Sequence, residues 1–360
     1  MKKLKLFTFF AAILLCFVNC SPKTEVVNEE PIFWTWSGYG PKQNWDTICT
    51  EMQRYGVTGL ILNAKEDGLR HVVPIAKKYG IKVHAWVWSL NDGSQVKDHP
   101  EWYSVNRLGH SLADSIAYVG YYKFLCPIIP EAREHVKEKF RKICQIEGLE
   151  GVSLDYHRFV DVILPTTLWA KYGIVQDKEY AEWDYGYHPK MIEAFQAEYG
   201  YDPRELEDPS TDDKWLQFRC DQVTSLANEI GEIAHENGKL LSASPFPTPA
   251  MSRSMVRQDW GKWKLDVAFP MIYHGFYTKE LSFIEDCVSE CLVEKYDSTD
   301  LYCGIISNQF RENGQKVADG IRAALKGGAK GVAFFQFSNL NQEEKESVKI
   351  LGDSIRAARR

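Results

Sequence analysis

The stretch TGLILNAKEDGLRHVVPIAKKYGIKVHAWVW, residues 58–88, carries the clearest secondary-structure signal in this 360-residue chain. An apolar run at 58–63 is followed by an amphipathic segment that ends at Tyr79-Gly80, and a second apolar run fills 81–88. Short apolar runs of this kind predict buried strands, and the segment between them predicts a helix that ends at a glycine. Because a helix between two strands makes them pair in parallel, the stretch predicts one unit of a parallel sheet.

The same alternation recurs on both sides of this stretch. Further strands are predicted at 31–37, 151–155, 240–244, 265–272, 301–305 and 331–335, and further helices at 45–55, 131–146, 215–237, 279–295, 314–326 and 342–358. Eight strand–helix units with right-handed crossovers close into a barrel. We therefore predict an α/β fold, a single (β/α)8 TIM-barrel domain over residues 31–360. A doubly wound sheet is the alternative, but Trp36-Ser-Gly-Tyr-Gly40 after the first strand lacks the usual phosphate-binding glycines.

The first 30 residues have the composition of an export signal. Lysines near the N-terminus precede an apolar run at 6–18 that is too short for a comfortable membrane span, which predicts a signal peptide at 1–19. Cys20 follows Phe17-Val18-Asn19 in a segment similar to a bacterial lipobox, and a polar stretch continues to residue 30. These features predict lipidation of Cys20, a tether at 20–30, and an exported lipoprotein anchored to the membrane of the bacterial cell envelope, on its periplasmic face or at the surface. A plain signal peptide, in which Cys20 has no role, is the alternative.

Composition narrows the choice of partners. The formal net charge of −6 gives no electrostatic reason to expect a nucleic acid. Apart from Cys16 and Cys20, seven cysteines remain, an odd number without the spacing of a metal site, so we expect buried free thiols, no metal and no cofactor. The 11 Trp, 18 Tyr and 18 Phe exceed what a core requires and favour a surface that stacks on sugar rings. The sequence does not specify an oligomeric state.

Candidate substrate-binding residues gather near the predicted strand ends. In a (β/α)8 barrel, the carboxyl ends of the strands and the loops after them carry the chemistry. Reading these ends in order brings together aromatic and hydrogen-bonding side chains, which we predict to bind a carbohydrate: Trp34, Trp36, Asn63, Trp86, Trp88, Tyr156, His157, Arg158, Gln258, Trp260, Tyr273 and Gln336. The Trp34/Trp36 and Trp86/Trp88 pairs each lie on one strand face, and filling of the barrel core is the alternative role for each tryptophan.

Four segments carry a resemblance to a known family. The sequences GVSLDYHR at 151–158, DVILP at 161–165, VRQDWGKW at 256–263 and LDVAFPMIY at 265–273 resemble the bacterial family-10-like glycosyl hydrolases. The resemblance extends over roughly residues 30–340. It implies a TIM barrel and a glycoside hydrolase that cleaves oligo- or polysaccharides by carboxylate acid/base catalysis. His157 stands where members often have a second acidic residue or an isoleucine, so a two-carboxylate scheme is not carried over to this strand.

Hydrolysis of a glycosidic bond requires two carboxyl groups, about 5–5.5 Å apart for retention or about 6.5–9.5 Å apart for inversion. Asp155 is the first candidate because it ends an otherwise apolar strand. We expect the nearby Arg158 to lower its pKa, as suits a nucleophile or general base. The structural alternative for Asp155 is an ion pair with Arg158 or a loop cap.

The partner of Asp155 is predicted to be Asp259, in the loop after the fifth strand, with His274 as an alternative proton donor. For Asp259, the structural alternative is an ion pair with Arg257 or Lys262 that fixes the loop. Asp161, Glu182 and Asp184 in the long segment after the fourth strand are further candidates.

Two long segments, residues 89–130 and 159–213, are rich in tyrosine and tryptophan. Long loops in a compact domain are usually functional or disordered, and aromatic richness argues against disorder, so we predict that both segments form the walls of the cleft. A carbohydrate-binding lipoprotein that uses the same scaffold without catalysis is the alternative function, because a fold does not fix an activity.

Overall fold

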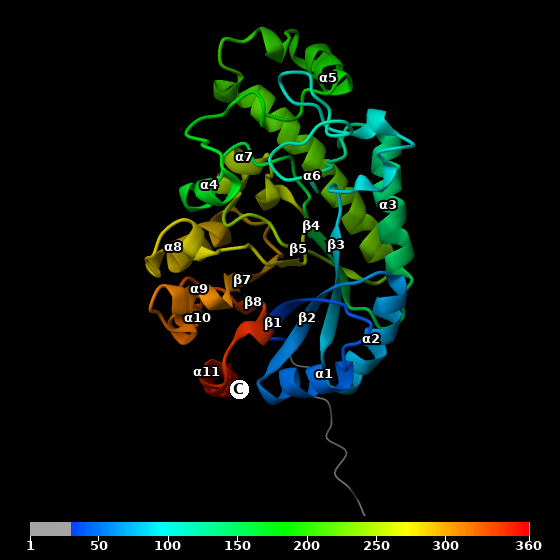
Figure 1. The fold of residues 1–360 in the computed structure, drawn as a ribbon. Coiled ribbons are helices and arrows are strands. Elements are labelled where there is room, and N and C mark those ends of the chain that lie inside the picture. Colours follow the sequence, from blue (N-terminus) through cyan, green and yellow to red (C-terminus); the bar gives the residue numbers. More distant parts are fainter. Residues whose placement is uncertain (1–29, 360) are drawn as a thin grey trace, which may run out of the picture.

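The computed structural model describes residues 30–359, so the signal peptide and Cys20 lie outside the described residues. Eight parallel strands form a closed barrel in chain order, as predicted (Figure 1). They are β1 Phe33–Gly38, β2 Val57–Asn63, β3 Lys82–Trp88, β4 Gly151–Asp155, β5 Leu240–Ala243, β6 Val267–Ala268, β7 Asp300–Ile306 and β8 Gly331–Phe335.

Helices follow the strands and surround the barrel (Figure 1). They are α1 Trp45–Arg54, α2 Glu66–Lys78, α3 Pro130–Cys144, α4 Thr166–Tyr172, α5 Pro189–Tyr199, α6 Asp213–Glu236, α7 Pro249–Val256, α8 Ser282–Glu294, α9 Ser307–Glu312, α10 Val317–Lys326 and α11 Gln342–Arg359. The main core is apolar and fills the space between the barrel and these helices. Within residues 30–359, no helix has both the length and the apolar character needed to cross a membrane.

The clearest departure from the predicted elements is β6. The apolar run at 265–272 predicts a full strand, but only Val267 and Ala268 form one. Pro270 interrupts the ladder because proline has no backbone N–H to donate. Pairing continues beyond it through single hydrogen bonds, from Met271 N to Pro245 O at 2.8 Å and from Gly304 N to Pro270 O at 2.9 Å.

Large aromatic side chains fill the interior of the barrel. Trp34 and Trp36 of β1 point inward and pack with Phe269 and Tyr302 in a buried cluster. Trp34 lies directly over Gly59 of β2, where a Cβ atom would come within 2.1 Å of the indole ring. The prediction that Trp34 and Trp36 bind substrate is therefore corrected: both tryptophans are part of the barrel core.

The two long segments lie side by side, on the far side of the molecule from α1 and α11 (Figure 1). Asn106 of the first segment donates from Nδ2 to Glu182 O of the second at 2.9 Å, and its backbone pairs with Tyr185. Because they follow β3 and β4, the segments rise from the carboxyl end of the barrel. They form one layered structure above that end.

A buried charge cluster joins the second segment to the barrel helices. Asp184 lies 2.6 Å from Arg219 Nη1 of α6 and 3.3 Å from Arg257 Nη2, which follows α7. Arg257 also pairs with Glu179. Burial alone would raise the pKa of Asp184, but the charges of Arg219 and Arg257 lower it overall. The cluster fixes the second segment to α6 and α7.

Candidate active site

Asp155 lies at the carboxyl end of β4 and points into the mouth of the barrel, on the same strand face as Ser153. Its Oδ2 accepts a hydrogen bond from Trp86 Nε1 at 2.7 Å, and its Oδ1 accepts one from the backbone N–H of Tyr156 at 2.6 Å. The residue is 8% exposed. A buried carboxyl group is therefore held in one orientation by an indole and a backbone amide.

The pKa of Asp155 is raised, contrary to the expectation from sequence. Burial is the largest cause and raises it, while the hydrogen bonds from Trp86 and Tyr156 and the charge of Arg158 oppose the shift without cancelling it. Arg158 has little effect because its guanidinium pairs with Asp161 instead, at 3.0 Å. A carboxyl group with a raised pKa is suited to donate a proton, which is the role of a general acid.

Tyr156 turns the chain sharply after Asp155. Its φ of 48° is in the left-handed region, which is uncommon for a residue with a side chain. The ring lies 4.5 Å from the ring of Trp88, centroid to centroid. Because the same turn aims the Tyr156 N–H at Asp155 Oδ1, it positions both the carboxyl group and an aromatic wall.

Asp161 is the second carboxyl group at this end of the barrel. Its Oδ2 accepts hydrogen bonds from Arg158 Nη1 at 3.0 Å, from Tyr122 Oη at 3.0 Å and from Tyr118 Oη. No hydrogen bond from residues 30–359 reaches its Oδ1. Asp161 is 2% exposed and lines a cavity. One of its oxygens is thus anchored while the other has no protein partner.

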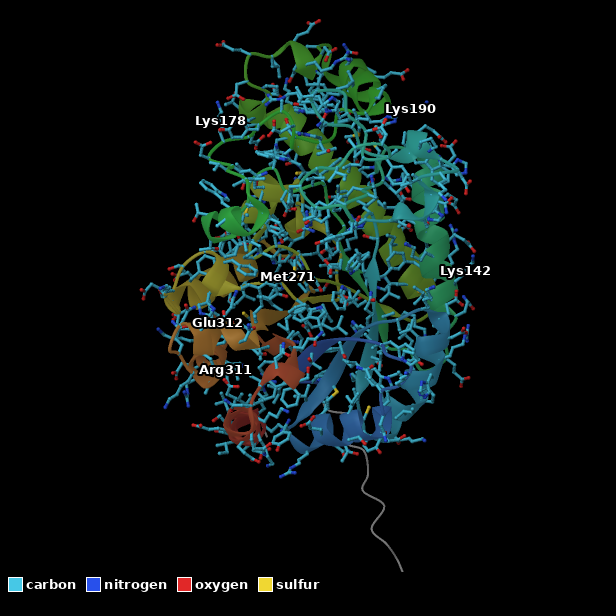
Figure 2. The ribbon with its side chains drawn as sticks, viewed as in Figure 1. Lys142, Lys178, Lys190, Met271, Arg311 and Glu312 are labelled. Atoms are coloured by element: carbon cyan, nitrogen blue, oxygen red, sulfur yellow. The ribbon has the colours of Figure 1, made fainter. Side chains whose placement is uncertain are left out.

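An aromatic cavity of about 170 Å³ is lined by Asp161 and by Tyr156, the residue that follows Asp155. Its wall combines tyrosines and apolar residues with the Arg158–Asp161 pair: Tyr118, Tyr121, Tyr122, Tyr156, Arg158, Asp161, Leu164, Pro165, Leu168, Tyr172, Phe246, Pro247, Met271, Tyr273, Phe276 and Tyr277. Met271 appears near the middle of the view in Figure 2, between Lys178 of the second long segment and Glu312 of α9. Rings carrying hydroxyl groups suit a ligand with apolar faces and polar edges, as a sugar has.

Arg158 is part of the cavity wall and holds it together. Its guanidinium carbon is between 5.1 and 5.6 Å from the ring centres of Tyr122, Phe124, Tyr156 and Phe246. A guanidinium close to the face of an aromatic ring is attracted to it by a cation–π interaction. Arg158 therefore lines the predicted site, and its main partners are Asp161 and these rings rather than Asp155.

A larger groove of about 730 Å³ lies between α2 and α3, beside the ends of β2 and β3. Trp86, which donates to Asp155, and Trp88, which packs on Tyr156, both line it. Asn63 at the end of β2 also lines the groove and donates from Nδ2 to Trp86 O at 3.0 Å. The structure thus brings Asn63, Trp86 and Trp88 together at the mouth, as predicted from the strand ends.

Asp259 does not accompany Asp155. Its carboxylate is buried outside the barrel, 2.8 Å from Lys262 Nζ and 3.1 Å from Arg253 Nη1, and it accepts from Gln217 of α6 at 3.3 Å. Burial would raise the pKa of Asp259, but these partners lower it overall. The prediction of a catalytic Asp259 is therefore corrected: the residue fixes its loop through Lys262 and Arg253, not through Arg257.

His274 is also turned away from the mouth. It is fully buried, its Nε2 lies 2.8 Å from Gln315 Oε1, and its ring packs on Phe310 of α9. Burial lowers its pKa, so the ring is neutral at physiological pH. The alternative proton donor predicted from the sequence is thus part of the packing between the barrel and α9.

Three predicted binding residues lie behind the cavity wall. His157 is buried between Ser89 Oγ at 2.8 Å and Val223 O at 3.0 Å, and burial lowers its pKa to about 3. Trp260 is buried in the main core. Gln258 accepts from Phe246 N at 3.0 Å and donates to His157 O at 3.1 Å. These residues support the wall, and the prediction that they contact substrate is corrected.

Tyr273 and Gln336 complete the rim. Tyr273 follows β6 and lines the aromatic cavity. Burial raises its pKa far above the usual range, and the nearby charge of Asp155 adds to the shift. Gln336 follows β8 and is half-buried, beside a separate hollow near β1. Asp155, Tyr273 and Gln336 therefore share the carboxyl end of the barrel, as predicted.

Sequence reasoning anticipated some of the cavity residues and missed others. Tyr118, Tyr121, Tyr122 and Tyr172 lie in the two tyrosine-rich segments, whose composition predicted a cleft wall. Phe246 and Tyr277 had no such signal, because they lie in short loops after β5 and β6. The role of Asp161 depends on side chains far away in sequence.

The cysteines behave as expected for buried thiols. All seven within residues 30–359 are free and buried. In the same range, no group of three or more His, Cys, Asp or Glu side chains could hold a metal ion.

No family model matches the chain, and none of the curated proteins matches it. Its fold is shared with solved glycosidases, each of which it covers only in part. A β-galactosidase from the psychrophilic Marinomonas ef1 superposes with a TM-score of 0.61 at 12% identity, over 90% of this chain and 59% of that one. α-L-Fucosidase isoenzyme 2 from Paenibacillus thiaminolyticus gives 0.56 at 12% identity, over 91% and 50%.

A GH42 β-galactosidase from G. stearothermophilus gives a TM-score of 0.57 at 10% identity, over 90% of this chain and 56% of that one. The chain thus spans 50–59% of the length of these three enzymes. At such low identity the likeness establishes the TIM-barrel fold alone.

Proposed function

We propose that the protein is a glycoside hydrolase that cleaves glycosidic bonds of oligo- or polysaccharides, with Asp155 as the general acid. The observation that carries the proposal is the carboxyl group of Asp155 at the carboxyl end of β4, which Trp86 Nε1 and the Tyr156 N–H hold in one orientation and whose pKa burial raises. The names of the structurally similar enzymes, β-galactosidases and an α-L-fucosidase, support this reaction class. The resemblance to family-10-like glycosyl hydrolases supports it independently.

The proposed reaction begins with proton transfer from Asp155 to the glycosidic oxygen. The bond between that oxygen and the anomeric carbon breaks, and positive charge develops on the sugar ring. Trp86 and the Tyr156 amide hold the carboxyl group in place before and after the transfer. Because both donate to it, they also stabilise the carboxylate that remains.

Asp161 takes the part of the second carboxyl group in this proposal, in place of Asp259. Its free Oδ1 supplies negative charge to the developing oxocarbenium-like centre, by direct attack or through a water molecule. Arg158, Tyr122 and Tyr118 fix Oδ2 and thereby orient Oδ1. The choice between these two routes determines retention or inversion at the anomeric carbon.

A panel of aryl glycosides, oligosaccharides and polysaccharides tests the proposal. We expect the purified protein to hydrolyse at least one of them, and Asp155→Asn and Asp161→Asn each to lower kcat by two or more orders of magnitude with unchanged circular dichroism. Asp259→Asn is the matched control, because its carboxylate lies outside the barrel. Full turnover by Asp155→Asn would overturn the assignment.

Carbohydrate binding without hydrolysis is the second candidate. The observation that favours it is the burial of both carboxyl groups, Asp155 and Asp161. Calorimetric binding of a sugar combined with no hydrolysis of any panel member would support this candidate over the first.

We further propose that the protein is exported and attached to the bacterial cell envelope through lipid on Cys20. The signal-like residues 1–19 and the lipobox-like segment before Cys20 support this location.

A further inference from the structure

Two exposed aromatic side chains touch each other at the carboxyl end of the barrel. Trp88 ends β3 and is 37% exposed, and Tyr121 of the first long segment is 51% exposed. Their ring centroids lie 6.0 Å apart, with an angle of 37° between the ring planes. Within the part of the chain that the structure describes, Tyr296 is the one other exposed aromatic residue. Two of these three rings therefore form one small surface, which we call the aromatic platform.

The rings of the aromatic platform are held in place by other rings. The centroid of Tyr156 lies 4.5 Å from that of Trp88 and 6.4 Å from that of Tyr121. Tyr121 also meets the buried Tyr122 edge to face at 5.0 Å. A side chain that is already ordered loses little conformational freedom when a ligand packs on it. The platform is thus preorganised, although a large part of each of its two rings faces solvent.

The aromatic platform adjoins the proposed general acid. Trp88 of β3 is the register partner of Asp155 on β4. Tyr156, which packs on both rings of the platform, follows Asp155 and donates its N–H to Asp155 Oδ1. Trp88 also lines the groove between α2 and α3, and Tyr121 lines the aromatic cavity. The platform therefore has one ring in the wall of each hollow.

The size of the aromatic platform suits a small ligand rather than a protein. An aromatic side chain has roughly 150–250 Å² of surface, so the exposed fractions of the two residues leave an area on the order of 200 Å². A stable protein partner covers about 800 Å² on each side of its interface. A sugar ring has C–H groups on its faces, which pack on an aromatic face, and hydroxyl groups at its edge, which stay in water. A saccharide is therefore the ligand that this surface fits.

Polar groups lie along the groove that Trp88 lines. Asn63 at the end of β2 donates from Nδ2 to Trp86 O at 3.0 Å, while its Oδ1 accepts no hydrogen bond from residues 30–359. Lys65 lines the same groove and is exposed. An amide oxygen accepts and an ammonium group donates hydrogen bonds, so both suit the hydroxyl groups at the edge of a sugar. The groove thus supplies polar partners for a saccharide whose face rests on Trp88.

From these observations we infer that the aromatic platform is a stacking site for a sugar unit of an oligo- or polysaccharide chain. The inference rests on the proposed carbohydrate substrate. Trp88 and Tyr121 donate no hydrogen bond to the carboxyl groups of Asp155 and Asp161, whose donors are other residues. The platform therefore contributes binding rather than chemistry. A chain that reaches both the carboxyl groups and the platform binds more tightly than a single sugar.

Affinity electrophoresis tests the aromatic platform without relying on hydrolysis. The Asp155→Asn protein is run through native gels that contain soluble β-glucan, xylan, galactomannan or pectic galactan. We expect at least one of these polymers to retard it. Tyr121→Ala and Trp88→Ala, each in this background, should raise the Kd for that polymer about tenfold. Circular dichroism verifies that each variant is folded, and Tyr121→Ala carries the test if Trp88→Ala does not fold.

Two further variants serve as controls. Tyr296→Ala is the matched control, because Tyr296 is a tyrosine that is 43% exposed in the turn between α8 and β7, at the amino end of the barrel. It should leave the Kd unchanged. Tyr121→Phe keeps the ring and removes the hydroxyl group, so it should bind as the parent does if stacking is the contact that matters.

The outcomes separate this inference from the hydrolase proposal. Unchanged retardation of folded Tyr121→Ala, or an equal loss for Tyr296→Ala, would overturn the platform. Absence of retardation by every polymer would overturn it too, and hydrolysis of an aryl glycoside would then leave the hydrolase proposal intact. Conversely, retardation that depends on Tyr121, without hydrolysis of any panel member, would overturn the hydrolase proposal and leave the platform in place.

Discussion

At the scale of single residues, the environment of Asp155 predicts the pH dependence of activity. A general acid works only while protonated, and burial raises the pKa of Asp155. We therefore expect kcat/KM to fall as the pH rises through this raised pKa, and the fall to occur above the pH range of an ordinary aspartate. For a substrate whose leaving group needs no protonation, such as a dinitrophenyl glycoside, the pH profile should lack this fall in kcat/KM. If the fall persists with that substrate, a titratable group other than Asp155 causes it.

The same carboxyl group predicts a gain in stability on substitution. Because its folded-state pKa is raised, Asp155 stabilises the fold below its unfolded-state pKa, and that contribution is lost as the pH rises through the folded-state pKa. At pH 7 the buried charge thus opposes folding, and Asp155→Asn should raise Tm on the order of 1–3 °C. The advantage should shrink at pH 4. A lower Tm for the variant at pH 7 would contradict the raised pKa.

At the scale of elements, the contact between β1 and β2 leaves no room for a side chain at Gly59. A Cβ atom there would lie 2.1 Å from Trp34 Cδ2, whereas one at Gly38 of β1 would meet nothing within 4 Å. Gly59→Ala should lower the free energy of unfolding by about 1–3 kcal/mol through overpacking. Gly38→Ala is the control, with little change expected. Urea denaturation of both variants measures the difference, and equal stabilities would contradict the packing of Trp34.

The attachment of the second long segment depends on Asp184. Asp184→Asn leaves Arg219 and Arg257 buried without their shared carboxylate, and the loss of one partner from a buried ion pair costs about 3–5 kcal/mol. We expect a lower Tm and faster proteolysis within 159–213. Asp177→Asn, at an exposed position of the same segment, should change neither. Unchanged proteolysis of Asp184→Asn would show that other contacts hold the segment.

At the scale of the whole molecule, the first prediction concerns location. If Cys20 carries the lipid, Cys20→Ala should move the protein from the membrane fraction to the soluble fraction of the envelope. Fractionation followed by immunoblotting measures this shift. A variant that stays with the membrane would show that another part of the chain attaches it.

The barrel was predictable from sequence because each strand repeats the same local pattern, and Gly56 and Gly80 mark helix ends with φ values of 74° and 68°. Pro270 shortened β6 in a way that hydrophobicity alone does not reveal. The face of each tryptophan was also readable, since Trp34, Trp36, Trp86 and Trp88 all sit at inward positions. How deeply each tryptophan is buried was not readable from the sequence, because burial depends on neighbours such as Gly59.

The candidate site was predictable only where it lies on strands. Asp155, Trp86 and Trp88 end β3 and β4, so the barrel topology brings them to one mouth. Asp161 obtains its partners from Tyr118 and Tyr122, about forty positions earlier in the chain. Asp259 was preferred to Asp161 in the sequence analysis, but its carboxylate pairs with Arg253 and Lys262 outside the barrel. Contacts between loops carry no local signal that would distinguish these two aspartates.

The seven buried thiols have a consequence for how the chain must fold. Burial raises the pKa of Cys49 to about 11 and that of Cys126 to about 12, so the native thiols are neither charged nor reachable. Before folding, each thiol is exposed with an ordinary pKa, and if the chain is exported as proposed, each thiol then meets enzymes that introduce disulfides. A cross-link between Cys49 of α1 and Cys220 of α6, for example, would hold together residues of two separate helices. An exported chain of this kind reaches its native state only if collapse around the thiols outruns their oxidation, so its yield is set by a competition between two rates.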